Sequence, residues 1–356
     1  MLNKSPIGLL LLSFAAWFGC DAPKPAGSQG GSSVSQSITK EQSDAASAAL
    51  AQGKKGAAKD KIALQLNWYP EAEHGGYYAA QVHGIFDKYN LDVEIRSGGK
   101  TTVTPQELAL GRIQFGIANA DDVLMARSQD VPLVTLMAPI QNGPRCIMVR
   151  KDSGIASFQD LKNMKLQIDS SRPYVPFLKS KGFLTEGIEI VPYFGSVAQL
   201  VSEKGVATQG YSFSEPFMAR QQGVEVTELM MSDIGYNPYC SVLITTESYR
   251  NKNDDICKRM TLACIEGWKK YIASPAESNA VILSKNKQGL EKAALDFGVE
   301  ALKPLCLIGG KDDSAIGTMT QERWVQLADT LASLKLINAE KASVEKAYTL
   351  NYLPKP

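Results

Sequence analysis

The sequence predicts an α/β protein, and three observations support this fold class. Apolar and polar residues alternate in KIALQLN at 61–67 and in LDVEIRS at 91–97, which is the period of a half-buried strand. Residues 104–107 (TPQE) place a hydroxyl, a proline and a carboxylate in the order that begins a helix. Strand and helix patterns then keep alternating, which predicts parallel sheets covered by helices on both faces.

The later elements follow the same alternation and then change to helices alone. A second helix start, with serine and aspartate in the capping positions, occupies 157–160. Further strands are expected at 114–118, 165–169, 189–193, 206–213, 224–229 and 241–246. After Tyr249 the apolar stripes predict helices for packing at 256–273, 276–284, 320–334 and 339–348.

Composition limits the class of function. The chain has 356 residues, 44% of them hydrophobic, so it can bury a core as two domains or as one bilobed unit. Lysine and arginine number 38 against 37 acidic residues, so the chain has almost no net positive charge to attract a nucleic acid. We therefore expect no nucleic-acid partner. The six cysteines are too scattered for a disulfide framework and form no CxxC pair of the kind that zinc sites use. Cys257 and Cys264, seven residues apart in a helix-like stretch, are expected to be small apolar core residues.

The chain has too few histidines for most kinds of histidine-based chemistry. The only histidines are His74 and His83, which argues against most histidine metal sites and against a Ser-His-Asp catalytic triad or a Cys-His catalytic dyad. Neither a P-loop nor a GxGxxG motif is present. We therefore expect no metal, no cofactor and no catalytic residue.

The first 60 residues have the composition of an export signal and a tether. Lys4 precedes an apolar run at 7–18 that has the length of a signal-peptide core, and Gly19-Cys20 follows at once. This end resembles a bacterial lipoprotein cleavage box, which implies that 1–20 is a signal peptide and that Cys20 is acylated. The alternative is cleavage by ordinary signal peptidase at a nearby small residue. Residues 21–60, rich in Ala, Gly, Ser, Gln and Lys, are expected to be a flexible tether.

Three loops at predicted strand ends collect aromatic and polar side chains. They are 67–78 (NWYPEAEHGGYY), 119–122 (NADD) and 210–216 (GYSFSEP). In an open sheet, ligands gather outside the carboxyl ends of parallel strands. Rings there stack on a flat guest and carboxylates accept its N–H groups, so a slot for a planar polar heterocycle is expected. For Asn119 and Ser214 a plain helix-capping role is an equal alternative.

The segment at 66–95, LNWYPEAEHGGYYAAQVHGIFDKYNLDVEI, resembles the opening of the thiamine-pyrimidine-precursor-binding and pyrimidine-synthase-like family. That group is related to the nitrate, sulfonate and taurine binding proteins of ABC importers. The likeness continues through 111–133, 144–169 and 210–223 and covers about 61–284. It implies a type II periplasmic-binding-protein fold: two α/β lobes with an interlobe cleft that closes about a hinge, and C-terminal helices. On this basis 61–148 is the first part of lobe 1, 149–233 is lobe 2, and 234–356 completes lobe 1.

The resemblance also implies which residues meet the ligand. Those matching the family's first loop, second loop and second-lobe acid are Asn67, Trp68, His74, Asn119, Asp121 and Glu215, with Trp68 as the stacking face. An opposing aromatic wall would come from among Tyr174, Tyr211 and Tyr239, and the sequence does not choose between them.

The synthase branch of this family is an enzyme, and its chemical groups are not kept here. Its pyridoxal-phosphate lysine and its substrate histidine would fall within 116–127, where this chain has Ala118 and Asp122. Its iron-binding cysteine cluster is matched only by Cys240. We therefore expect a binding protein without enzymatic activity.

The whole sequence is thus interpreted as an exported, lipid-anchored monomer on the extracytoplasmic face of a membrane. It would capture a thiamine-related pyrimidine, or another small planar heterocycle, for an ABC permease and its ATPase. An alternative is a binder of a sulfonate, taurine or nitrate anion, which Arg145 and Arg172 would favour.

Overall fold

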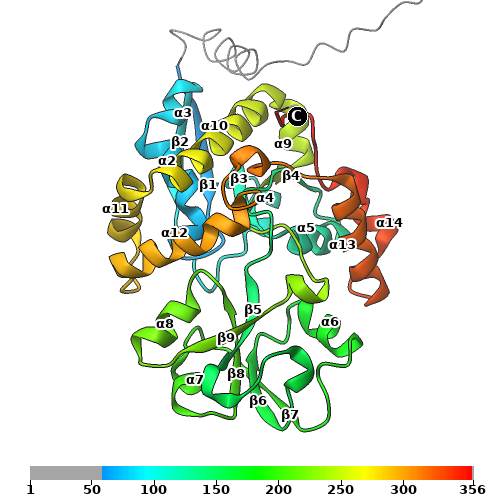
Figure 1. The fold of residues 1–356 in the computed structure, drawn as a ribbon. Helices are drawn as coiled ribbons and strands as arrows, with labels where there is room; N and C mark the ends of the chain where they lie inside the picture. The colour runs from blue at the N-terminus through cyan, green and yellow to red at the C-terminus, as the bar shows by residue number, and fades with distance from the viewer. Residues whose placement is uncertain (1–57, 355–356) are drawn as a thin grey trace, which may run out of the picture. The chain divides into compact units, whose positions relative to one another are not determined.

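The computed structural model describes residues 58–354 (Figure 1). The predicted signal peptide, the acylated Cys20 and nearly all of the predicted tether lie outside the described residues. Within 58–354 no helix has both the length and the apolar character needed to span a bilayer. The folded body begins with a strand at Asp60, one residue before the predicted start.

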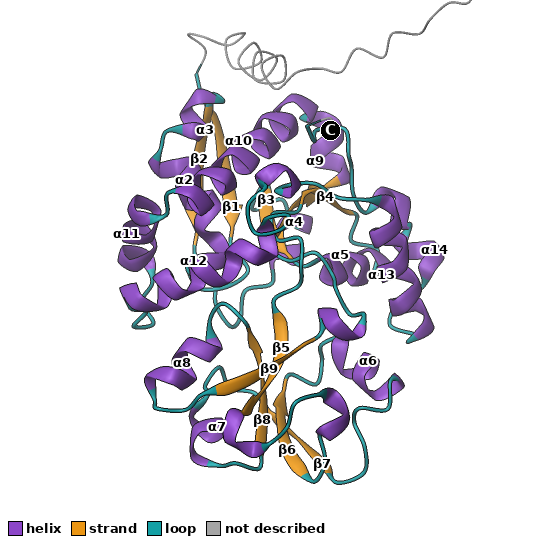
Figure 2. Cartoon of the chain, in the orientation of Figure 1, coloured by secondary structure: helices purple, strands orange, loops and turns teal. Residues whose placement is uncertain are grey.

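Two five-stranded sheets form the frame of the molecule (Figure 2). The first has the order β2-β1-β3-β10-β4, with β2 at Leu91–Arg96, β1 at Asp60–Gln65, β3 at Phe115–Ala118, β10 at Val242–Thr246 and β4 at Leu133–Met137. The second has the order β7-β6-β8-β5-β9, with β7 at Ile188–Pro192, β6 at Met164–Ile168, β8 at Val206–Tyr211, β5 at Arg145–Arg150 and β9 at Val226–Met230. We call the parts built on these sheets lobe 1 and lobe 2.

Each sheet is mixed, which corrects the expectation of purely parallel sheets. In lobe 1, β1 is parallel to β2 and β3, but β10 runs antiparallel to β3 and β4. In lobe 2, β6 is parallel to β7 and β8, but β5 runs antiparallel to β8 and β9. The reversed strands β5 and β10 are the two that follow a passage from the other lobe. They enter their sheet from the edge where the parallel strands end, so their direction is opposite.

Helices cover both faces of the lobe 1 sheet, as the alternation predicted. One face carries a core with helices α2 (Gly75–Val82), α3 (Ile85–Lys88), α10 (Asp254–Ala273), α11 (Ala276–Lys285) and α12 (Lys292–Cys306). The other face packs on α4 (Thr104–Ala109), α5 (Ala120–Ser128), α13 (Gln321–Ser333) and α14 (Ala339–Ala342). Alternate side chains of β1 lie in the two cores: Ile62 and Leu64 belong to the first and Ala63 to the second.

The lobe 2 sheet is covered in the same way. Its larger core includes the 3-10 helix η3 (Phe158–Asp160) and α6 (Tyr174–Ser180), and its smaller one includes α7 (Ala198–Ser202) and α8 (Glu215–Gln221). The remaining short helices are η1 (Ala72–His74), η2 (Lys151–Ser153), η4 (Ser232–Ile234), α9 (Glu247–Lys252), η5 (Asp313–Ala315) and η6 (Val344–Lys346).

Local sequence signals account for several of these elements. Ser157 and Asp160 form the predicted capping box at η3. Helix α4 begins at Thr104, one residue earlier than predicted, so the Thr104 hydroxyl does not cap it as expected. The Thr104 side chain is instead buried against β3, where a Cβ on Gly116 would lie 2.1 Å from its methyl group. The five described cysteines are free and buried, with Cys257 and Cys264 in the lobe 1 core as predicted.

Candidate functional site

The three loops picked out from the sequence meet between the lobes. Two follow β1 and β3 of lobe 1, and the third follows β8 of lobe 2, so each leaves the carboxyl end of a parallel strand. The Ser214 hydroxyl donates to the Glu71 carboxylate at 3.5 Å, and the Asn119 amide donates to the Tyr211 hydroxyl at 3.4 Å. Both hydrogen bonds join lobe 1 to lobe 2.

Arg145 lies beside two of the three tyrosines proposed as an aromatic wall. Its guanidinium carbon is 4.9 Å from the ring centre of Tyr174 and 4.9 Å from that of Tyr211. One of its nitrogens also donates to the Tyr211 hydroxyl at 2.7 Å. Cation–π contacts of this kind are strongest where water is excluded, and Arg145 is only 8% exposed. The sequence named Arg145 only for the anion alternative.

Three carboxyl groups from the two lobes lie within electrostatic range of one another. Loss of solvation raises the pKa of Glu71 well above its usual value, and the neighbouring Glu73 and Glu215 raise it further. Burial raises the pKa of Glu73 to about 7 and also raises that of Glu215. We call Glu71, Glu73 and Glu215 the acid cluster. Glu71 and Glu73 were not singled out from the sequence, although two glutamates in a short aromatic loop were a visible signal.

Glu215 is held in place from within lobe 2. Its carboxylate accepts from the Tyr211 backbone N–H at 2.8 Å and from the Tyr193 hydroxyl at 2.9 Å. Ser214, just before it, begins α8 without making a side-chain capping bond and turns to Glu71 instead. A plain capping role therefore does not explain Ser214.

His74 and Asn67 hold the first loop in shape. His74 is fully buried, and burial lowers its pKa to about 3, so the ring is neutral at ordinary pH. Its Nδ1 accepts from the Glu71 backbone N–H at 3.4 Å, which assigns the proton to Nε2, 2.9 Å from the Asn67 amide oxygen. The next residue, Gly75, is needed for packing, because a Cβ there would lie 2.0 Å from the Tyr271 ring.

Asn119 and the two aspartates after it come from the start of α5. Asn119 makes no capping bond with its side chain; its oxygen accepts from the Ser241 backbone N–H at 3.3 Å. Asp121 is 2% exposed and accepts from the Tyr236 hydroxyl at 2.7 Å. Asp122 lies 3.4 Å from Arg172 of lobe 2, and burial followed by the charge of Asp121 raises the Asp122 pKa to about 6.

The structure does not bring Trp68 and Tyr239 into this set of contacts. Trp68 is partly exposed and packs edge-on against Tyr69, with ring centres 5.2 Å apart. Tyr239 is buried on the other side of the lobe 1 sheet, where Arg323 stacks on its ring and its hydroxyl accepts from the Thr320 backbone N–H. Of the three tyrosines the sequence left open, Tyr174 and Tyr211 are the pair that lie together.

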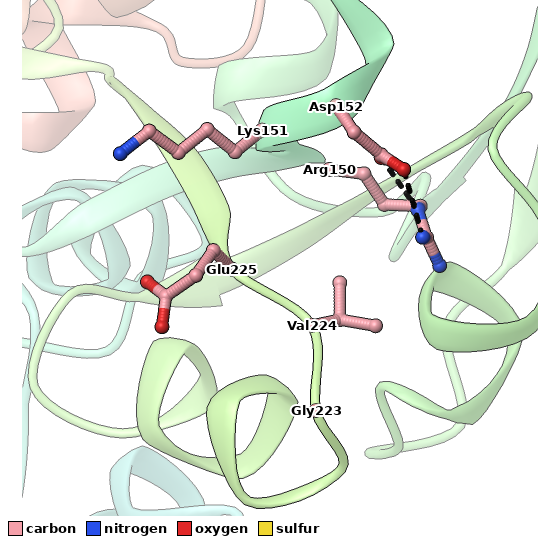
Figure 3. Close-up of a pocket in the computed structure, with 6 residues that line it drawn as sticks. All are labelled: Arg150, Lys151, Asp152, Gly223, Val224 and Glu225. Carbon is pink, nitrogen blue, oxygen red and sulfur yellow. Dashed lines mark hydrogen bonds and ion pairs between the residues drawn. The ribbon is translucent and has the colours of Figure 1, made fainter.

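Two cavities help to delimit the site. A small one of about 50 Å³ borders the acid cluster and is lined from both lobes by Glu71, Ala72, Phe213, Ser214, Met218, Leu290, Ala294 and Leu295. A wider one of about 360 Å³ lies at the far end of β5, lined by Arg150, Lys151, Asp152, Gly223, Val224 and Glu225 (Figure 3). There Arg150 and Asp152 pair with each other at 2.9 Å. The larger cavity is therefore not where the candidate residues meet.

Among residues 58–354, no three histidine, cysteine or acidic side chains are grouped in a way that could hold a metal ion. What the site offers is hydrogen-bond acceptors, the half-buried ring of Tyr211 and one buried cation. Such a set can bind a small polar molecule with aromatic character by stacking and by charge-assisted hydrogen bonds.

Comparison with known proteins gives matches along most of the chain. A family described as NMT1/THI5 like matches residues 71–278, more than half of the chain. The formylaminopyrimidine-binding protein of Halalkalibacterium halodurans is 24% identical over 288 residues, covering 76% of this chain and 87% of that protein. The riboflavin-binding protein RibY of Chloroflexus aurantiacus is 25% identical over 309 residues, covering 82% of this chain and 83% of that protein.

Solved structures confirm the fold class. The periplasmic aliphatic sulphonate binding protein SsuA from Escherichia coli superposes with a TM-score of 0.64 at 16% identity, covering 83% of this chain and 92% of that one. The type II periplasmic-binding-protein fold predicted from the sequence is thus confirmed, as is the family resemblance. Since the family match extends over more than half of its length, the chain belongs to the NMT1/THI5-like family.

Proposed function

We propose that this protein is the solute-binding component of an ABC importer and that it captures a thiamine-related pyrimidine, or a similar planar heterocycle, between its lobes. It would be exported, held to the membrane through an acylated Cys20, and monomeric, with a permease and an ATPase as partners. Two relatives matched over most of their length are named as binding proteins, which supports capture without turnover. An affinity near micromolar, about −8 kcal/mol, is expected.

The acid cluster is the observation that carries this proposal. An amino-substituted heterocycle presents N–H donors next to ring nitrogens that accept. An ionised carboxylate accepts from the amino group, and a protonated one donates to a ring nitrogen. With a pKa raised to about 7, Glu73 has both forms available near neutral pH. Because the cluster joins Glu71 and Glu73 of lobe 1 to Glu215 of lobe 2, a guest bound there would hold the lobes together.

The other candidate residues take distinct roles in this proposal. Tyr211 forms one side of the slot, with Tyr174 buried behind Arg145. Trp68, in the first loop, stacks on the opposite face of the ring. The side chains of Asn119 and Asp121 are polar contacts at the second loop. Asn67 and His74 are positioning residues, since their hydrogen bonds fix the loop that carries Glu71 and Glu73. Tyr239, packed beneath Arg323, supports the chain behind the site.

The anion alternative rests on Arg145 and Arg172. Both are already engaged: Arg145 donates to Tyr211 at 2.7 Å, and Arg172 lies 3.4 Å from Asp122 and 3.2 Å from Asp169. A sulfonate or nitrate would also approach the acid cluster, where any ionised carboxylate repels an anion and a protonated one offers a single donor. These contacts favour a donor-bearing heterocycle over an anion.

A thermal-shift screen of the purified protein tests the proposal. Formylaminopyrimidine and hydroxymethylpyrimidine are expected to raise the melting temperature, because a ligand that binds only the folded state stabilises it. Riboflavin tests a larger heterocycle, and taurine and nitrate test the anion alternative. A shift with the anions alone would refute pyrimidine capture. Chemical change of either pyrimidine on incubation would refute a pure binding role.

A further inference from the structure

The two passages between the lobes are bonded to each other. Residues 138–144 lead from β4 to β5, and residues 231–241 lead from β9 to β10 (Figure 1). The Asn237 side-chain amide donates to the Asn142 side-chain oxygen at 2.7 Å, and the Gly143 backbone N–H donates to the Asn237 side-chain oxygen at 2.7 Å. Ile140 and Cys240 add an antiparallel bridge between the passages. The passages therefore form a short two-stranded link.

Arg323, from α13 of lobe 1, spans both passages. Its Nε and Nη2 donate to the Asn237 backbone carbonyl at 3.1 and 2.9 Å, and Nη2 also reaches the Asn237 side-chain oxygen at 2.9 Å. Its Nη1 donates to the backbone carbonyl of Gln141 in the other passage. The guanidinium carbon lies 3.9 Å from the ring centre of Tyr239, so the group is stacked as well as bonded. One planar cation thus fixes the spacing of two strands.

Other lobe 1 groups secure the same end of the link. The backbone N–H groups of Gln141 and Asn142 both donate to the Leu305 carbonyl at the end of α12, at 2.8 and 3.0 Å. The Gln141 side chain donates to the Thr318 carbonyl at 3.0 Å. Residues 140–142 and 237–240 are therefore tied to lobe 1, so the bend between the lobes is left to the chain on the lobe 2 side of them.

We propose that Arg323 is a positioning residue that sets where the lobes pivot, by clamping Gln141 and Asn237 to lobe 1. The clamp lies outside the acid cluster and does not depend on what the protein binds. A guanidinium suits this task because its fork of fixed N–H groups reaches two carbonyls at once, whereas an ammonium is a point donor on a flexible stem. Arg323→Lys keeps the charge and loses the fork.

The test measures the distance between the lobes in the empty protein. Spin labels on cysteines introduced at exposed Asp92 of lobe 1 and exposed Glu186 of lobe 2 report that distance by double electron–electron resonance. We expect Arg323→Lys to widen the distance distribution at least about two-fold, since freeing one passage adds a second bending point. Asn237→Ala, which removes the oxygen shared by Gly143 and Arg323, is expected to widen it as well.

A matched control separates pivoting from general loss of stability. Arg259 is another buried arginine of lobe 1, 1% exposed, and it joins Asp60, Asp255 and the Tyr89 carbonyl within that lobe. Arg259→Lys is expected to lower the melting temperature without widening the distribution. Distributions for Arg323→Lys and Asn237→Ala that superimpose on the wild type would overturn the proposal. So would equal widening by Arg259→Lys.

Discussion

The Glu73 carboxylate accepts a hydrogen bond from the Ser241 hydroxyl at 2.9 Å, although the two residues are 168 positions apart in the chain. Ser241 lies where the second passage returns to lobe 1, and its backbone N–H donates to Asn119. The bond ties the first loop to the end of the link between the lobes. Glu73 is 3% exposed, so a largely desolvated carboxyl group lies at the centre of the site.

Glu73 should make the empty protein less stable as the pH rises. Burial raises its folded-state pKa from the usual 4.5 to about 7, so between these values the folded state keeps a proton that the unfolded chain has lost. Its contribution is therefore fully present below about pH 4.5 and is lost as the pH passes 7, at most about 3 kcal/mol. We expect the melting temperature of Glu73→Gln minus that of the wild type to increase from pH 5 to pH 8.

His74 affects the pH dependence of stability in the opposite direction. Its pKa falls from 6.5 to about 3 in the folded state, so its contribution to stability is lost as the pH falls through this range. Taking the difference between variant and wild type at each pH removes this shared effect. Glu186→Gln, an exposed change in lobe 2, should give a flat difference. A flat difference for Glu73→Gln would show that Glu73 is not the proton-binding group.

Replacing Trp68 with alanine should weaken pyrimidine capture about ten-fold or more while the fold stays intact, because a stacked indole is lost. Titration calorimetry with hydroxymethylpyrimidine measures the change. Tyr249→Ala serves as the control, since Tyr249 is another partly buried aromatic of lobe 1, packed on Phe115 of the same lobe. Unchanged affinity in Trp68→Ala would remove the indole from the site.

Glu215→Gln should also weaken capture about ten-fold or more. The amide keeps the shape of the side chain but replaces one acceptor with a donor, which the amino group of a pyrimidine cannot satisfy. Glu228→Gln, a change of the same type on β9 of the same sheet, is expected to stay within about two-fold of the wild type. Equal affinities for the two variants would mean that Glu215 does not contact the guest.

Acylation of Cys20 predicts where the protein is found after cell fractionation. Expressed from its own signal sequence in a bacterial host, the wild type should remain with the membranes. Cys20→Ser should appear in the soluble extracytoplasmic fraction, since the anchor is lost. Ser28→Ala, a change in the tether, should behave as the wild type. Membrane retention of Cys20→Ser would contradict a lipid anchor.

Much of the fold could be predicted because its signals are local. The alternation at 61–67 and 91–97 gave β1 and β2, and the apolar stripe at 256–273 gave α10. Strands β4 and β5 were not predicted. The antiparallel direction of β10 could not be predicted from local pattern, because an isolated strand carries no mark of its direction in a sheet. Helix α12 was missed, and its interior Pro304 is a residue that normally signals a helix end.

The candidate site, too, could be predicted from the sequence only in part. The three loops were predicted from strand ends, and their meeting follows from the fold. Glu73 meets Ser241, which lies 168 positions away, and Glu71 meets Ser214 of lobe 2, and no local pattern encodes either contact. Arg145 looks like any strand residue in the sequence, and only the tertiary structure sets its guanidinium beside Tyr174 and Tyr211.

A crystal structure of the protein with bound formylaminopyrimidine would show directly whether the guest is held between the lobes. We expect the ring to lie between the lobes, stacked by Trp68 with Tyr211 on its other side, and with its amino group hydrogen-bonded to the acid cluster. A guest found in the cavity beside Arg150 and Glu225, or an indole of Trp68 turned away from the bound ring, would contradict it.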